Sequence, residues 1–118
     1  MLGNVFTQTY YLPGTLAANV DIRFIPAINC KLIHVSCCGS NASNAVMVIG
    51  TSSDNDAYLT AVDVGDSNVP SEFDRDDFVN TQYPRLPKGD VVSVLIDYDG
   101  AGGTAVANLS IVLTLLEG

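Results

Sequence analysis

Residues 105–116 read Ala-Val-Ala-Asn-Leu-Ser-Ile-Val-Leu-Thr-Leu-Leu, and this stretch decides the fold class. Its odd-numbered positions are all apolar, whereas its even-numbered positions mix apolar and polar side chains. Successive side chains of a β-strand point to opposite faces, so the pattern is typical of a strand with one buried face. Residues 19–25 repeat the alternation, with an apolar face that consists of Val20, Ile22 and Phe24.

Turn-forming residues, chiefly Gly, Pro, Asn and Asp, separate the strand-like stretches along the rest of the chain. No stretch of about ten residues has helical periodicity; the best short candidate, residues 71–78, predicts one helical turn. The 118 residues therefore predict a single all-β domain, residues 1–118, with seven or eight short antiparallel strands. We expect a β-sandwich or jelly roll, with an up-and-down barrel as the alternative. The expected strands are 5–12, 19–25, 30–38, 45–50, 57–62, 91–98 and 104–116, with a less regular piece at 68–80.

A glycine-rich turn precedes the last strand. Residues 97–103 read Asp-Tyr-Asp-Gly-Ala-Gly-Gly, and both Asp-Gly and Gly-Gly tolerate the positive φ of tight hairpin turns. The stretch therefore predicts the tip of a hairpin between residues 91–98 and 104–116.

Charge and hydropathy argue against two classes of partner. Thirteen acidic and five basic side chains give a net charge of -8, which opposes binding to nucleic acid and to anionic membrane surfaces. No apolar run approaches the ~18 residues of a membrane-spanning helix. Since no basic residue precedes Arg23, the first residues do not resemble a secretory signal, and we expect synthesis in a cytoplasm.

The cysteines and the single histidine are the first candidates for chemistry. Cys30, His34 and Cys38 have the spacing of one strand face, but a rise of about 13 Å between neighbours cannot place all three at one zinc ion. A site shared by subunits across a symmetry axis would escape this argument. We expect Cys30, Cys37 and Cys38 to be structural thiols.

We expect no enzymatic activity. The lone histidine would have to serve as the base for Ser36 or a cysteine, and its neighbours have the pattern of a scaffold strand. The sequence predicts no catalytic residue, no cofactor and no metal of high specificity.

Acidic side chains in the middle of the chain are weak calcium candidates. Calcium takes six to eight oxygen ligands from flexible loops, but neither acidic stretch continues to the closing glutamate of a calcium loop. Solvated loops and ion pairs are the favoured interpretation. The candidates are Asp54, Asp56, Asp74, Asp76 and Asp77.

The N-terminal segment, residues 1–12, is rich in large apolar side chains that a freely moving tail would not need. Two interpretations remain open: an arm that docks on a partner's sheet edge, or the first strand of the chain's own sandwich. The candidates for docking are Phe6, Tyr10, Tyr11 and Leu12.

Taken together, several segments resemble the small capsid decoration, or cement, proteins of tailed bacteriophages. These segments are residues 5–12, the strand 19–26, residues 31–36, the pair 46–51 and 54–59, and Pro-Lys-Gly-Asp at 87–90 before a long C-terminal hairpin. The resemblance implies a virion protein, made in the host cytoplasm, that binds the capsid exterior as a homotrimer. Its partners would be copies of itself and the major capsid protein, whose contacts it would cement.

A carbohydrate- or receptor-binding β-domain of a phage fibre or spike is the alternative. Such a domain needs aromatic side chains that stack on a ligand, and this chain lacks tryptophan, the strongest of them. Its phenols are Tyr10, Tyr11, Tyr58, Tyr83 and Tyr98.

Overall fold

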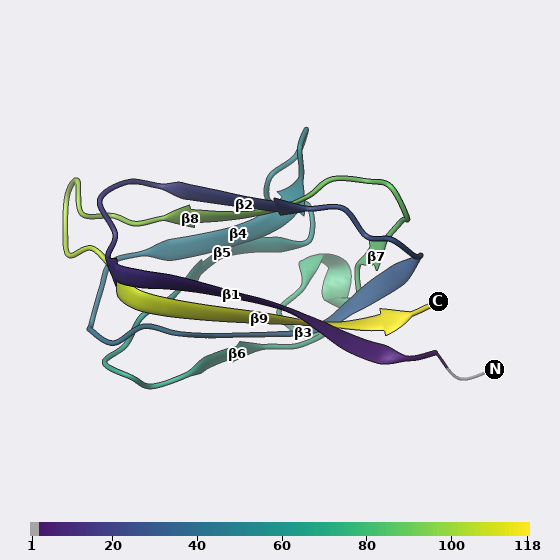
Figure 1. The fold of residues 1–118 in the computed structure, drawn as a ribbon, viewed down its shortest axis with the longest axis horizontal. Helices are drawn as coiled ribbons and strands as arrows, with labels where there is room; N and C mark the ends of the chain where they lie inside the picture. Colours follow the sequence, from purple (N-terminus) through teal and green to yellow (C-terminus); the bar gives the residue numbers. More distant parts are fainter. Residues whose placement is uncertain (1–2) are drawn as a thin grey trace.

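Two antiparallel β-sheets pack face to face (Figure 1). A computed structural model describes residues 3–118 of the chain. Sheet A has the strand order β1-β9-β3-β6, with β7 attached to β3, and sheet B has the order β2-β8-β4-β5. The strands are β1 (Val5–Thr15), β2 (Val20–Phe24), β3 (Cys30–Cys38), β4 (Val46–Thr51), β5 (Leu59–Asp63), β6 (Ser71–Phe73), β7 (Arg85–Leu86), β8 (Val92–Asp97) and β9 (Ala107–Glu117).

The strand order is that of a jelly roll. Antiparallel pairs β1–β9, β2–β8, β3–β6 and β4–β5 nest inside one another along the chain and fall alternately in sheets A and B. The all-β sandwich expected from the sequence is thereby confirmed.

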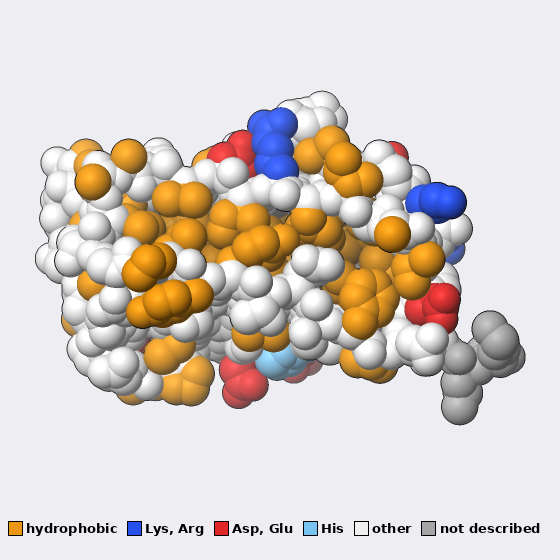
Figure 2. Space-filling model, in the orientation of Figure 1, with side chains coloured by type: hydrophobic (Ala, Val, Ile, Leu, Met, Phe, Trp, Pro, Cys, Tyr) orange, Lys and Arg blue, Asp and Glu red, His pale blue; other side chains and the backbone are white. Residues whose placement is uncertain are grey.

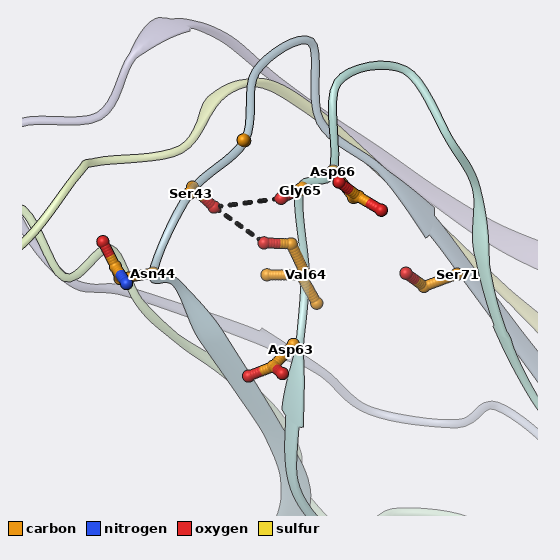
Figure 3. Close-up of a pocket in the computed structure, with 8 residues that line it drawn as sticks. Ser43, Asn44, Asp63, Val64, Gly65, Asp66 and Ser71 are labelled. Atoms are coloured by element: carbon orange, nitrogen blue, oxygen red, sulfur yellow. Dashed lines mark hydrogen bonds between the residues drawn. The ribbon is translucent and has the colours of Figure 1, made fainter.

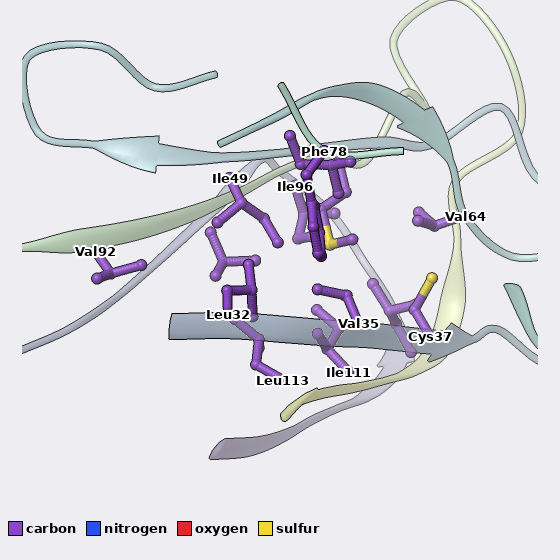
Figure 4. Close-up of a cluster of buried hydrophobic side chains, with 14 of the residues drawn as sticks. Leu32, Val35, Cys37, Ile49, Val64, Phe78, Val92, Ile96, Ile111 and Leu113 are labelled. Atoms are coloured by element: carbon purple, nitrogen blue, oxygen red, sulfur yellow. The ribbon is translucent and has the colours of Figure 1, made fainter. Parts of the chain in front are cut away.

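Inward-facing side chains from both sheets form one hydrophobic core (Figure 4). On β9, Leu109, Ile111, Leu113 and Leu115 are buried while their even-numbered neighbours are partly exposed, which confirms the alternation seen in the sequence. Sheet B contributes its own buried row, including Ile96 opposite these leucines. Interdigitation of the two rows holds the sheets together.

A β-bulge in β3 changes which side chains share a face. Leu32 pairs with Leu115 but His34 pairs with Thr114, so the partner strand advances one residue while β3 advances two. The inward face therefore switches parity, and Cys30 points into the core whereas His34 and Cys38 lie on the outer side. The expectation that Cys30, His34 and Cys38 share one face is wrong, because it assumed an unbroken strand.

The C-terminal hairpin expected from residues 97–103 is also absent. β8 pairs with β2 and β4 in sheet B, whereas β9 pairs with β1 and β3 in sheet A. Asp99 nevertheless has a positive φ of 44°, the backbone conformation that the turn residues were expected to adopt. Residues 98–106 therefore form a connection between the sheets and not the tip of a hairpin.

In the described part of the chain, one short 3-10 helix, η1 (Val79–Thr81), interrupts the strands. The helical turn expected at residues 71–78 is replaced by β6 and by a turn in which Asp77 N–H donates to Asp74 O at 3.0 Å. Within residues 3–118, no helix has the length and apolar character needed to cross a bilayer.

Candidate interaction surfaces

His34 faces an acid across the outer side of sheet A. Its Nε2 lies 3.4 Å from Oε1 of Glu72, whose side chain is 68% exposed. Among the described residues, no hydrogen bond joins His34 to Ser36 or Cys38, the nucleophiles considered from the sequence. This contact lies at the surface, where it contributes little to stability, and it does not activate a nucleophile.

The three thiols differ in burial. Cys30 and Cys37 are buried and free, whereas Cys38 is partly exposed. Burial, together with the neighbouring Cys38, raises the pKa of Cys37 to about 12. Burial also raises the pKa of Cys30. A high thiol pKa leaves almost no thiolate at neutral pH, which makes these two side chains poor nucleophiles and poor metal ligands.

Thiol–disulfide exchange of the native chain should therefore occur in two phases. Cys38 should react with a disulfide reagent first, and Cys30 and Cys37 should react at least tenfold more slowly, at rates set by opening of the core. Denaturant should merge the phases into three equivalents, counted by the absorbance of the released thiolate. Three equal rates in the native chain would contradict the buried positions of Cys30 and Cys37.

The acidic candidates lie on exposed loops, and the carboxylates of Asp74 and Asp77 accept hydrogen bonds from backbone N–H groups of their own loop. The Asp77 carboxylate accepts a hydrogen bond from Asp74 N at 2.9 Å, and the Asp74 carboxylate accepts one from Asp76 N at 3.1 Å. In the other loop, a side-chain hydrogen bond with Asp54 raises the pKa of Asp56. No group of three or more His, Cys, Asp or Glu residues within the described range is arranged to hold a metal ion.

A polar hollow of about 360 Å³ lies between the β5–β6 connection and the segment before β4 (Figure 3). Ser43 Oγ, on its wall, donates to Val64 O at 2.7 Å, and Asn44 Oδ1 accepts from Thr104 N at 2.8 Å. These polar atoms hold the connecting loops together. Asp63 and Asp66 are the acids of this hollow, and among the described residues no histidine, lysine or arginine lines it.

A second hollow, of about 300 Å³, brings together two of the tyrosines noted in the sequence. Tyr58 and Tyr83 line it together with Asn80, Gln82 and Arg85. Burial, followed by the nearby Asp90 carboxylate, raises the pKa of Tyr58. Aromatic side chains beside amide and guanidinium donors are groups that bind sugars, but the hollow is lined by loops and strand ends and is not enclosed.

An apolar seam lies on the side of the sandwich where β1 and β2 form the edges of their sheets (Figure 2). Its side chains pack against the core yet remain partly exposed, and the rings of Tyr10 and Phe24 cross it with centroids 6.5 Å apart. Patches of this kind on soluble proteins mark interaction sites. The apolar seam consists of Phe6, Tyr10, Leu12, Leu16, Val20, Ile22 and Phe24.

One border of the seam is the free edge of β1. The ladder between β1 and β9 continues to Asn4, whose carbonyl accepts from Glu117 N at 2.9 Å, so the even-numbered residues of β1 make the hydrogen bonds to β9. The backbone N–H and C=O groups of Val5, Thr7, Thr9 and Tyr11 must then point away from the sheet. Such an edge is a template for pairing with another strand.

The structure places the N-terminal segment in β1, the first strand of sheet A, and residues 1–2 of the expected arm lie outside the described residues. Of the docking candidates, Phe6, Tyr10 and Leu12 face the core side of the strand, and Tyr11 is exposed on the other side. Sequence reasoning did not identify β2 as a second edge beside them.

Comparison with known proteins adds a structural likeness. No protein-family model and no curated protein sequence matches the chain. The chain is similar to a chain of the cyanophage Pam1 capsid asymmetric unit, with a TM-score of 0.53 and 14% identity over 99% of this chain and 87% of that one. A second similar structure is PliG of Aeromonas hydrophila, a periplasmic inhibitor of g-type lysozyme, at a TM-score of 0.41 and 10% identity over 96% and 87% of the chains, too low to indicate a common fold. The chain therefore shares its fold with a component of a phage capsid.

Proposed function

We propose that the chain is a structural protein of a phage virion, which binds the outside of the capsid as a homotrimer and cements contacts between major capsid subunits. The observation that carries the proposal is the likeness to the Pam1 capsid chain, which extends over 99% of this chain. The proposal assigns no catalytic activity, cofactor or metal to the chain.

The surface of the molecule is consistent with this role. An apolar seam beside a free strand edge favours protein partners, because both features are satisfied by another polypeptide. A net charge of -8 suits the outer face of a shell, away from packaged nucleic acid.

Addition of the chain should stabilise empty shells of the major capsid protein encoded in the same genome. A ligand that binds only the assembled shell adds about 2.7 kcal/mol of stability when its free concentration is about 100 times its dissociation constant. We expect saturable co-sedimentation with shells and a rise of several degrees in their melting temperature, measured by calorimetry. An acidic protein of similar size serves as the control for charge. No co-sedimentation at micromolar concentration would contradict the proposal.

A carbohydrate- or receptor-binding function is the second candidate, and the hollow between Tyr58 and Tyr83 favours it. Saturation-transfer NMR with neutral oligosaccharides tests this function directly. A signal that Tyr83→Ala removes would favour a fibre or spike domain over a cement protein.

A further inference from the structure

The apolar seam coincides with the least charged part of the chain. Between Val5 and Ile28, the charged residues are Asp21 and Arg23, which pair with each other at 2.9 Å. Asp21 also accepts a hydrogen bond from the buried Ser93 hydroxyl at 2.7 Å, which together with Arg23 lowers the pKa of this carboxyl group. Both edge strands and the seam between them are therefore electrically neutral, and the net charge of -8 lies on the rest of the molecule.

Exposed apolar side chains gather in the same segment. Six large hydrophobic residues of the described chain are exposed, and four of them, Val5, Tyr11, Ile25 and Ile28, belong to β1, β2 or the residues that follow β2. Val5 and Tyr11 lie on the outer side of β1, and Ile25 and Ile28 follow β2, so these side chains border the seam and are not part of it. A partner strand that pairs with the β1 edge would cover part of this apolar surface.

We propose that the seam is the contact between copies of this chain, in which the β1 edge of one copy lies beside the β2 edge of the next. The number of copies, three, rests on the function proposed above. Both edges border the same side of the sandwich (Figure 1). A three-fold axis that runs parallel to the strands and faces the seam therefore brings β1 of each copy next to β2 of its neighbour. Such a contact is head-to-tail and closes into a ring.

Strand direction fits the same arrangement. β1 and β2 run in opposite directions, since a short connection at one end of the sandwich joins them (Figure 1). Rotation about an axis parallel to the strands preserves direction, so β1 of one copy and β2 of the next are antiparallel. The free N–H and C=O groups of Val5, Thr7, Thr9 and Tyr11 then face a second free edge.

Charge favours a second copy of the chain as the occupant. Two molecules with a net charge of -8 repel each other wherever their acidic loops meet, and like charges across an interface cost several kcal/mol. Contact through the neutral seam keeps the acidic loops, such as Asp54–Asp56 and Asp74–Asp77, at the periphery of the assembly. The seam is thus the surface through which copies approach with the least repulsion.

Two matched substitutions test the inference by light scattering and sedimentation. Gln8→Glu adds a carboxylate on the seam side of β1, between Phe6 and Tyr10, and Thr60→Glu adds the same charge to β5, an edge strand on the other side of sheet B. Gln8 is partly exposed and Thr60 is exposed, so both variants should fold, which circular dichroism checks. We expect Gln8→Glu to weaken the trimer about 100-fold, because it brings three carboxylates together in the contact, while Thr60→Glu stays trimeric.

Amide hydrogen exchange provides a readout without substitution. In the assembled wild-type chain the amides of Val5, Thr7, Thr9 and Tyr11 should exchange at least tenfold more slowly than in the dilute monomer, because they become hydrogen-bonded to the next copy. A monomeric wild-type chain, unprotected β1 amides, or equal effects of the two glutamates would overturn the inference. A trimer that Gln8→Glu disrupts but that binds no shells would instead overturn the proposed capsid function and support this inference.

Discussion

Replacement of Leu113 by alanine should lower the free energy of unfolding by about 3 kcal/mol. Leu113 has no exposed surface and sits in the middle of β9, where it pairs with Gln8 on one side and Val35 on the other. Truncation removes apolar contacts and leaves a cavity that two flanking strands prevent from collapsing. Urea denaturation followed by circular dichroism measures the loss.

Thr60→Ala is the control for this change, because Thr60 is exposed on the edge strand β5. It should cost less than about 1 kcal/mol. A loss below 1 kcal/mol for Leu113→Ala, with an unchanged dependence on urea, would mean that the odd-numbered face of β9 does not form the core.

Gly50→Ala should destabilise the chain by about 3 kcal/mol through a different mechanism. The loop after β4 folds back over Gly50, where Thr51 N donates to Asp54 O at 2.8 Å and Tyr58 N donates to Ile49 O at 2.9 Å. A Cβ at position 50 would overlap the backbone of this loop, with Ala57 N only 2.7 Å away. Backbone atoms cannot move aside as a flexible side chain can.

Gly102→Ala is the matched control, because a Cβ there meets nothing within 4 Å. Its effect on the melting temperature should be close to zero, since a surface substitution usually changes stability by no more than about 0.5 kcal/mol. Equal melting temperatures for Gly50→Ala and Gly102→Ala would show that the loop does not lie against Gly50.

Strand alternation was the part of the fold that the sequence could predict. The buried face of β9 and the inward positions of Val20, Ile22 and Phe24 follow from a period of two, which depends only on neighbours along the chain. The bulge before His34 depends on how β3 and β9 pair, and the destination of the chain after residues 97–103 depends on which sheet accepts β9. Neither is encoded in the strand spacing that predicted a shared face for Cys30, His34 and Cys38, or in the turn chemistry that predicted a hairpin.

The same limit applies to the candidate surface. The sequence singled out Phe6, Tyr10 and Leu12 because they are apolar near a terminus, but not their position beside Phe24. That position arises because, within residues 3–118, β1 pairs only with β9 and β2 only with β8, which leaves both strands at the edges of their sheets. Edges are a property of the complete topology, and they become visible only when every strand has been placed.

Electron cryo-microscopy of shells decorated with the purified chain tests the central claim most directly. The account predicts three copies on the outer surface around each local three-fold axis, with β1 and β2 of adjacent copies side by side and the apolar seam covered. Shells that carry no density for the chain, or that carry it with the seam exposed to solvent, would contradict the account.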